Sequence, residues 1–97
     1  MIFQIYASGD TVLVEAEDGT NGVAYLGRKD EFDWQTGVGI ALLRWELEIE
    51  ADDEPNLGYF GRIEVSEHDL VVCADELAST EGWELERMAD CVRYDWI

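Results

Sequence analysis

Hydrophobic and polar residues alternate most regularly over residues 43–50. There Leu43, Trp45, Leu47 and Ile49 alternate with Arg44, Glu46, Glu48 and Glu50. A period of two is typical of a half-buried β-strand, with one face in a core and the other in water. The pattern therefore predicts a central strand whose solvent face is a row of carboxylates. The acidic turn Asp52–Asn56 should end this strand, because Pro55 cannot donate a hydrogen bond to a sheet.

The N-terminal part of the chain predicts a β-meander. Ile2–Tyr6 and Thr11–Glu17 are expected to be strands. The segment between Asp18 and Gly22 contains Asp-Gly and Asn-Gly, the dipeptides of tight hairpins. Val23–Gly27 should then return antiparallel to the second strand, while Arg28–Thr36 reads as a polar connection.

Two glycines argue against a helix in the segment that follows. Gly37 and Gly39 lie close together, and each glycine costs about 1 kcal/mol relative to alanine inside a helix. We therefore expect the apolar run Val38–Leu43 to lead directly into the central strand. Tyr59–Ser66 is expected to be the partner of that strand, with Ile63 and Val65 pointing inward.

The sequence after the partner strand favours a helix. Ser66 has the character of an N-cap with Asp69 three residues later. The apolar residues that then fall on one helical face are Leu70, Val71, Ala74, Leu77 and Ala78. A strand at Leu70–Ala74 is the alternative, because its β-branched residues are poor helix formers.

Residues 80–97 fit two patterns equally well. A second helix would place Leu85, Met88, Ala89, Val92 and Trp96 on one face. A hairpin of Trp83–Arg87 with Cys91–Trp96 would bury the same aromatic side chains. Either way, we predict one domain spanning residues 1–97, of α+β class, in which an antiparallel sheet of about five strands carries one or two helices towards the C-terminus.

Charge narrows the possible partners. The chain has 23 acidic residues against six basic ones, a formal net charge of −17. Such a chain repels itself when compact, so folding alone does not select this surface. It also repels phosphate, which argues against direct binding of nucleic acid or of an anionic membrane.

Candidate chemistry is sparse, and no family motif is present. His68 is the only histidine and lies beside Asp69, without a recognisable nucleophile. Cys73 and Cys91 lack the spacing of a metal site, and we expect both to be reduced, buried thiols in a cytoplasmic protein. The turn Asp52–Asn56 lacks the ligand spacing of a calcium loop. We expect neither an enzyme nor a cofactor.

The acidic strand and turn are the candidate site. We expect it to bind a basic protein surface, of the kind that nucleic-acid-binding proteins present, by mimicking phosphate charge. The predicted contact residues are Glu46, Glu48, Glu50, Asp52, Asp53, Glu54, Glu64 on the partner strand, and Trp34. Trp34 is equally compatible with a buried core residue and with an exposed residue that contacts the partner. The second reading follows from the enrichment of tryptophan at interface hot spots.

Small phage inhibitors of CRISPR and restriction systems share this general acidic character, without any shared motif. The alternative is an ordinary small domain adapted to a salty cytoplasm, which the abundance of acids and the single lysine, Lys29, also fit.

Overall fold

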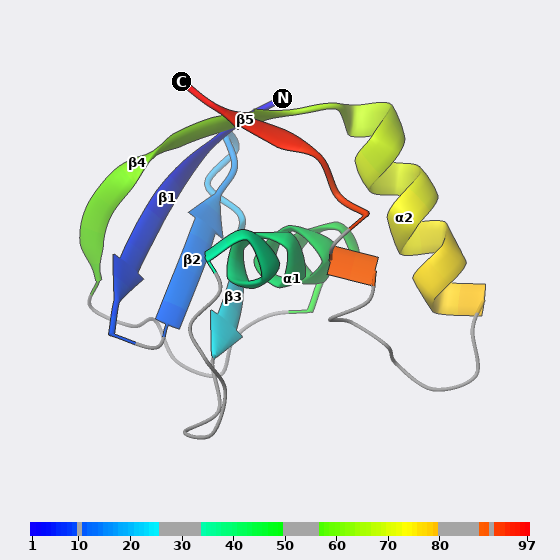
Figure 1. Ribbon diagram of the computed structural model, residues 1–97, viewed down its shortest axis with the longest axis horizontal. Coiled ribbons are helices and arrows are strands. Elements are labelled where there is room, and N and C mark those ends of the chain that lie inside the picture. Colours follow the sequence, from blue (N-terminus) through cyan, green and yellow to red (C-terminus); the bar gives the residue numbers. More distant parts are fainter. Residues whose placement is uncertain (10, 26–33, 50–56, 80–87, 90) are drawn as a thin grey trace.

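A computed structural model describes residues 1–9, 11–25, 34–49, 57–79, 88–89 and 91–97. Its elements in chain order are β1 (Ile2–Ser8), β2 (Thr11–Glu15), β3 (Asn21–Tyr25), α1 (Trp34–Glu46), β4 (Gly58–Val65), α2 (Glu67–Ser79) and β5 (Tyr94–Trp96). The five strands form one antiparallel sheet in the order β3-β2-β1-β4-β5. The predicted α+β class with an antiparallel sheet is thus confirmed (Figure 1).

The meander β1–β2–β3 forms as the turn residues predict. The turn between β2 and β3 places Gly19 at a φ of 88°, a conformation that glycine adopts without strain. In the same turn Asp18 Oδ1 accepts a hydrogen bond of 3.0 Å from the backbone N–H of Thr20. A hydrogen bond from the Thr20 hydroxyl, together with this backbone bond, holds the pKa of Asp18 below its ordinary value.

β4 is the predicted partner strand, but its neighbours are β1 and β5. Its inward residues Ile63 and Val65 are fully buried, as expected. The chain ends border the same strand: the Met1 ammonium donates to the Val65 carbonyl over 2.8 Å, and the Ile97 N–H donates to the Arg62 carbonyl over 3.1 Å.

The predicted central strand is wrong. Residues 43–46 form the last turn of α1, and Leu47 and Glu48 form the turn that follows it. The expected connection through Thr36 is also wrong from Trp34 onwards, and so is the argument that Gly37 and Gly39 exclude a helix. The alternation of apolar and charged residues arises at the end of a helix.

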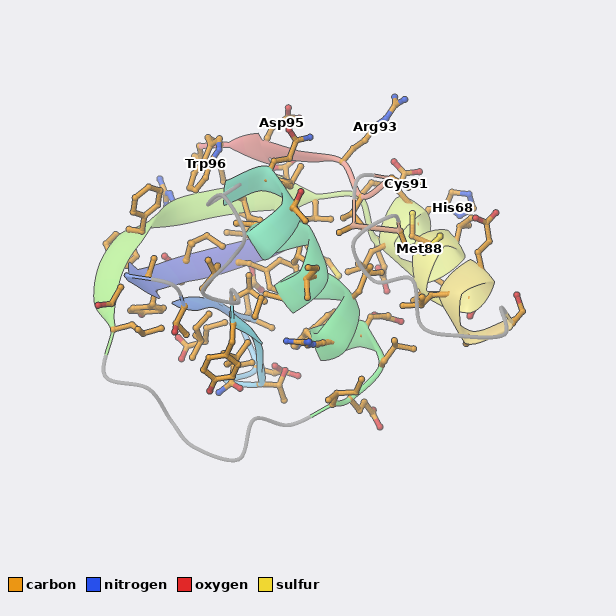
Figure 2. The ribbon with its side chains drawn as sticks, turned by 60° about the horizontal axis from the view of Figure 1, so that its bottom comes forward. His68, Met88, Cys91, Arg93, Asp95 and Trp96 are labelled. Atoms are coloured by element: carbon orange, nitrogen blue, oxygen red, sulfur yellow. The ribbon has the colours of Figure 1, made fainter. Side chains whose placement is uncertain are left out.

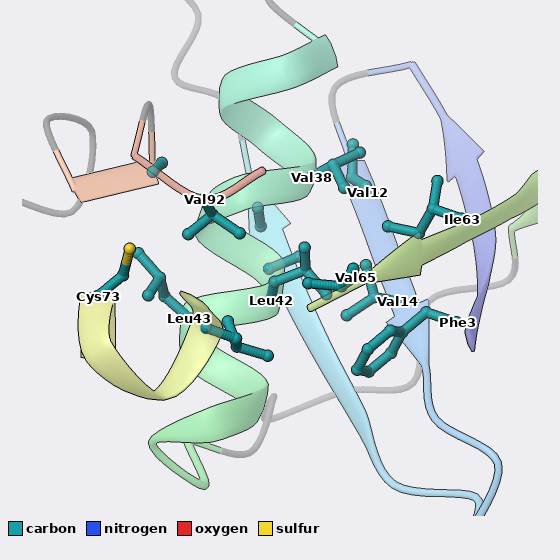
Figure 3. Packing of buried hydrophobic residues seen from close by; sticks show 14 of the residues in the cluster. Phe3, Val12, Val14, Val38, Leu42, Leu43, Ile63, Val65, Cys73 and Val92 are labelled. Atoms are coloured by element: carbon teal, nitrogen blue, oxygen red, sulfur yellow. The ribbon is translucent and has the colours of Figure 1, made fainter. Parts of the chain in front are cut away.

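The reason is that α1 is buried on more than one side. It packs on β2 and β3 and also contacts α2. Figure 3 shows Leu42 directed towards Val14 and Val65, while Leu43 is directed towards α2. Both leucines are fully buried. A helix enclosed in this way has no single apolar face, so the periodicity expected of an amphipathic helix is absent.

Glycine allows this close packing. A Cβ atom on Gly39 would lie 2.6 Å from the carbonyl oxygen of Ala89, and one on Gly22 in β3 would lie 2.8 Å from the backbone nitrogen of Trp45. Gly39 would weaken an isolated helix, but here only glycine leaves room for the backbone of Ala89. Packing against neighbours therefore outweighs the propensity of about 1 kcal/mol on which the prediction relied.

α2 confirms the predicted helix after Ser66. The Ser66 hydroxyl lies 3.5 Å from the backbone nitrogen of Asp69, the position of an N-cap bond. Leu70, Ala74 and Leu77 are buried as expected. Ala78 is exposed, and Cys73 is buried.

At the C-terminus the single long helix is wrong, because residues 94–96 form β5 and pair with β4. The hairpin alternative correctly gave a strand near Trp96. Its other predicted strand, Trp83–Arg87, lies outside the described residues.

Candidate functional site

Glu46 and Glu48, the described part of the predicted row of carboxylates, do not lie on a strand. Glu46 ends α1, and Glu48 lies in the turn after it. Glu64 is on β4, where it faces Asp95 of β5. Glu50, Asp52, Asp53 and Glu54 lie outside the described residues; Trp34 begins α1, and its side chain is not among the described ones. The structure instead puts Glu46 within electrostatic reach of Glu67 and Asp75 of α2.

Glu48 occupies an unusual position at the end of α1. The N–H of Ile49 donates to the Arg44 carbonyl over 2.9 Å, and the N–H of Glu48 donates to the Trp45 carbonyl over 3.1 Å. This pair of bonds is a Schellman motif, whose left-handed residue is usually glycine. Here it is Glu48, with a φ of 58°. A side chain in this conformation costs about 1 kcal/mol.

Glu46 is half-buried among other acids. Burial raises its pKa above the ordinary value of 4.5, and the charges of Glu67, Asp75 and Glu48 raise it further. All four causes act in the same direction. Partial desolvation and the neighbouring charges therefore both disfavour the ionised form of Glu46. We call Glu46, Glu48, Glu67 and Asp75 the carboxylate cluster.

The helix dipoles make two members of the cluster still less favourable. Glu46 and Glu48 stand at the negative end of α1, where an acid costs about 0.3–1 kcal/mol. Arg44 is the only base in the last turn of α1, and its guanidinium donates to the Val23 carbonyl over 2.8 Å. Glu67, by contrast, lies in the first turn of α2, where a negative charge is favourable.

The end of α1 is held firmly against the sheet. The Trp45 indole Nε1 donates to the Thr20 hydroxyl over 2.6 Å, and its ring meets Phe3 edge to face at 4.9 Å between centroids. Sequence analysis placed Trp45 in the core, and this contact is consistent with that placement, although the element is a helix. These contacts anchor the end of α1 that carries Glu46.

The remaining candidates offer little chemistry. His68 is exposed in the first turn of α2. Cys73 is buried as expected, but Cys91 is exposed, which corrects the prediction that both are buried. Among the described residues, no three His, Cys, Asp or Glu side chains are grouped so that they could hold a metal ion. Neither α1 nor α2 is long and apolar enough to cross a membrane.

Sequence reasoning missed Glu67 and Asp75. They are eight residues apart on α2, a rise of about 12 Å. No local pattern indicates that the end of α1 lies near them, because that contact depends on tertiary packing. No family model, curated protein or solved structure matches the chain.

Proposed function

We propose that the protein is a non-enzymatic binding protein that occupies a basic surface of a partner protein through its carboxylate cluster. The partner surface is one that otherwise binds nucleic acid, so the protein acts as a competitive inhibitor in the cytoplasm. The observation that carries this proposal is the packing of α1 on α2, which puts the half-buried Glu46 within electrostatic reach of Glu67 and Asp75.

The magnitudes support a role for this charge beyond folding. The strained Glu48 and the two acids at the negative end of α1 together cost on the order of 1–3 kcal/mol. A domain of this kind has a total stability of about 5–15 kcal/mol. A basic partner would relieve the repulsion within the cluster, so binding recovers free energy that folding does not.

The rest of the chain adds a long-range contribution. A net charge of −17 speeds encounter with a positive surface, and salt screens this effect within a Debye length of about 8 Å at physiological ionic strength. Binding should therefore weaken steeply with added salt. The anchored end of α1 limits the entropy that Glu46 loses on binding.

The test is affinity capture from the native cytoplasm with elution by a salt gradient. The first variant neutralises the cluster with Glu46→Gln, Glu48→Gln, Glu67→Gln and Asp75→Asn. The matched control removes the same charge elsewhere, with Glu15→Gln, Glu17→Gln, Glu64→Gln and Asp95→Asn. We expect a nucleic-acid-binding protein that duplex DNA displaces, and that the cluster variant releases at lower salt than the control. Equal elution of the two variants, or no displacement by DNA, contradicts the proposal.

The single lysine beside 23 acids also favours a second candidate, a domain adapted to high salt. Thermal melting against salt concentration separates the two. A salt-adapted domain loses its structure at low ionic strength, because unscreened carboxylates then repel one another. A binding protein from an ordinary cytoplasm stays folded there.

A further inference from the structure

Two exposed aromatic side chains stand together at the β5 edge of the sheet. Phe60 of β4 is 52% exposed and Trp96 of β5 is 48% exposed, and their ring centroids are 5.5 Å apart. Tyr94 also meets Trp96, with 6.0 Å between centroids. β5 ends the sheet, and Figure 2 shows Trp96 on it at the periphery of the molecule. We call Phe60 and Trp96 the aromatic pair.

A β-bulge in β4 brings Phe60 to this place. Ile5 of β1 is opposite Gly61, whereas the next residue, Tyr6, is opposite Tyr59. β4 therefore has one residue more than β1 at this point, and that residue is Phe60. An extra residue of this kind bends its strand and redirects its side chain, and bulges are common at sheet edges and functional sites. The strand thus departs from the regular ladder at the residue that meets Trp96.

Glycine provides the room for Trp96. Trp96 is opposite Ile63, so it lies on the same face of the two strands as Gly61, two residues before Ile63. A Cβ atom on Gly61 would lie 3.2 Å from Trp96 Cζ3, whereas ordinary contacts are 3.4–4 Å. The indole therefore lies close over the backbone of β4. The bulge and the glycine together hold the two rings side by side before any partner binds.

The charge of the chain selects the kind of partner that covers these rings. A second copy would bring a further net charge of −17, and nucleic acid would bring phosphate, so the chain repels both. It attracts a basic protein surface. The face of an indole ring attracts cations as well, and the planar, weakly hydrated guanidinium of arginine stacks on it better than the ammonium of lysine.

The charged side chains along β4 and β5 balance one another. Glu64 and Asp95 are opposite each other, with Arg62 and Arg93 diagonally across from them. These residues alternate with Trp96 along the strands and so lie on the other face. The attraction for a cation at the aromatic pair therefore comes from the rings and from the charge of the whole chain.

We infer that the aromatic pair is a binding site for an arginine side chain of the basic partner protein, with the guanidinium stacked on the indole of Trp96. This inference rests on the proposed function, which supplies the basic partner. It adds a short-range contact to the long-range attraction. Net charge speeds the encounter, and a desolvated aromatic contact slows dissociation.

The experiment titrates the whole protein with two peptides of equal charge, acetylated and amidated hexa-arginine and hexa-lysine. Calorimetry gives the two affinities, and nitrogen–proton correlation spectra follow the indole N–H signals. We expect hexa-arginine to bind about two- to fivefold more tightly, the factor that an exposed cation–π contact provides. The Trp96 signal, identified by its loss in Trp96→Leu, should shift more than that of Trp45, whose indole N–H is bonded to Thr20.

An exposed aromatic residue at the opposite edge of the sheet provides the matched control. Tyr25 on β3 is 55% exposed. Trp96→Leu keeps an apolar side chain and should abolish the preference for arginine, and Phe60→Leu should weaken it. Tyr25→Leu should leave the preference unchanged. Circular dichroism of each variant checks that it is folded, and the indole shift of the wild type tests the site without any variant.

Equal affinities for the two peptides, or a preference that survives in Trp96→Leu, would overturn the inference. So would self-association of the wild type that Trp96→Leu abolishes, since the pair would then bind a second copy. Neutralising the carboxylate cluster should weaken both peptides alike. If Trp96→Leu leaves the elution of a captured partner unchanged, this inference fails and the proposed function stands. An arginine preference at Trp96 with no captured partner contradicts the proposed function instead.

Discussion

Replacing Gly22 with alanine tests how closely α1 packs on β3. The added Cβ would overlap the Ala41 carbonyl oxygen, and it would lie 2.8 Å from the Trp45 nitrogen and 2.9 Å from the Trp45 Cβ. Ordinary contacts of this kind are 3.4–4 Å. The obstacles are helix backbone, which cannot rotate away as a side chain can. α1 must therefore move off the sheet.

That movement has a measurable cost. The end of α1 is tied to the sheet by the bonds from Arg44 to Val23 and from Trp45 to Thr20. Overpacking a well-filled core costs about 1–3 kcal/mol, and a shift of backbone against these ties belongs at the upper end. For a domain of this size, about 3 kcal/mol corresponds to a fall in melting temperature of about 12–24 °C.

Thermal and urea unfolding measure this loss. The matched control is Gly58→Ala in β4, where the nearest atom to the added Cβ is the Ala7 carbonyl oxygen at 3.9 Å. The control should melt within a few degrees of the wild type, because the site has room. If Gly22→Ala melts together with Gly58→Ala, the packing of α1 on β3 is not as close as described, and the reasoning fails.

Three further predictions concern the end of α1. Glu48→Gly should raise the free energy of unfolding by about 1 kcal/mol, since glycine adopts the left-handed conformation freely; a lower melting temperature would contradict this. Glu46→Gln should stabilise the fold at pH 7, because the folded-state pKa of Glu46 is raised. As pH falls, Glu46 takes up a proton at a higher pH in the folded protein than in the unfolded chain. The stability gained by Glu46→Gln, measured by unfolding at a series of pH values, should therefore shrink as pH falls through the folded-state pKa towards 4.5. Trp45→Phe removes the hydrogen bond to Thr20 and should lower the free energy of urea unfolding by about 0.5–1.5 kcal/mol. In the Trp45→Phe background, Thr20→Val has no bond to Trp45 left to remove, so this bond should add little to its cost.

The sheet was largely predictable because its signals are local. The Asp-Gly and Asn-Gly dipeptides placed the hairpin, and the predicted strand Thr11–Glu17 forms β2, in which Val12 and Val14 are fully buried. Ser66 marked the start of α2 for the same reason, since an N-cap is recognised within a few residues of sequence.

α1 was not predictable because the features that decide it lie elsewhere in the chain. Gly39 is accommodated by Ala89, which is far away in the sequence, and Leu43 is buried by α2. The strand-like alternation continues to Ile49, yet that residue is 38% exposed beyond the helix end. A local period of two was therefore misleading where burial came from both sides.

The candidate site was predictable in part. Composition and pattern named Glu46 and Glu48 as candidates, but they did not indicate that Glu67 and Asp75 lie near Glu46. Glu67 and Asp75 act on Glu46 because α2 packs against α1. The grouping of charges from separate elements requires the tertiary fold.

The enclosure of α1 between sheet and second helix also bears on how the molecule opens. Leu42 belongs to the interface with the sheet, and Leu43 to the interface with α2. Neither layer can peel away without exposing one of them to water. Amide hydrogens in the middle of α1 should therefore exchange with deuterium only when the entire molecule unfolds, and be the slowest to do so.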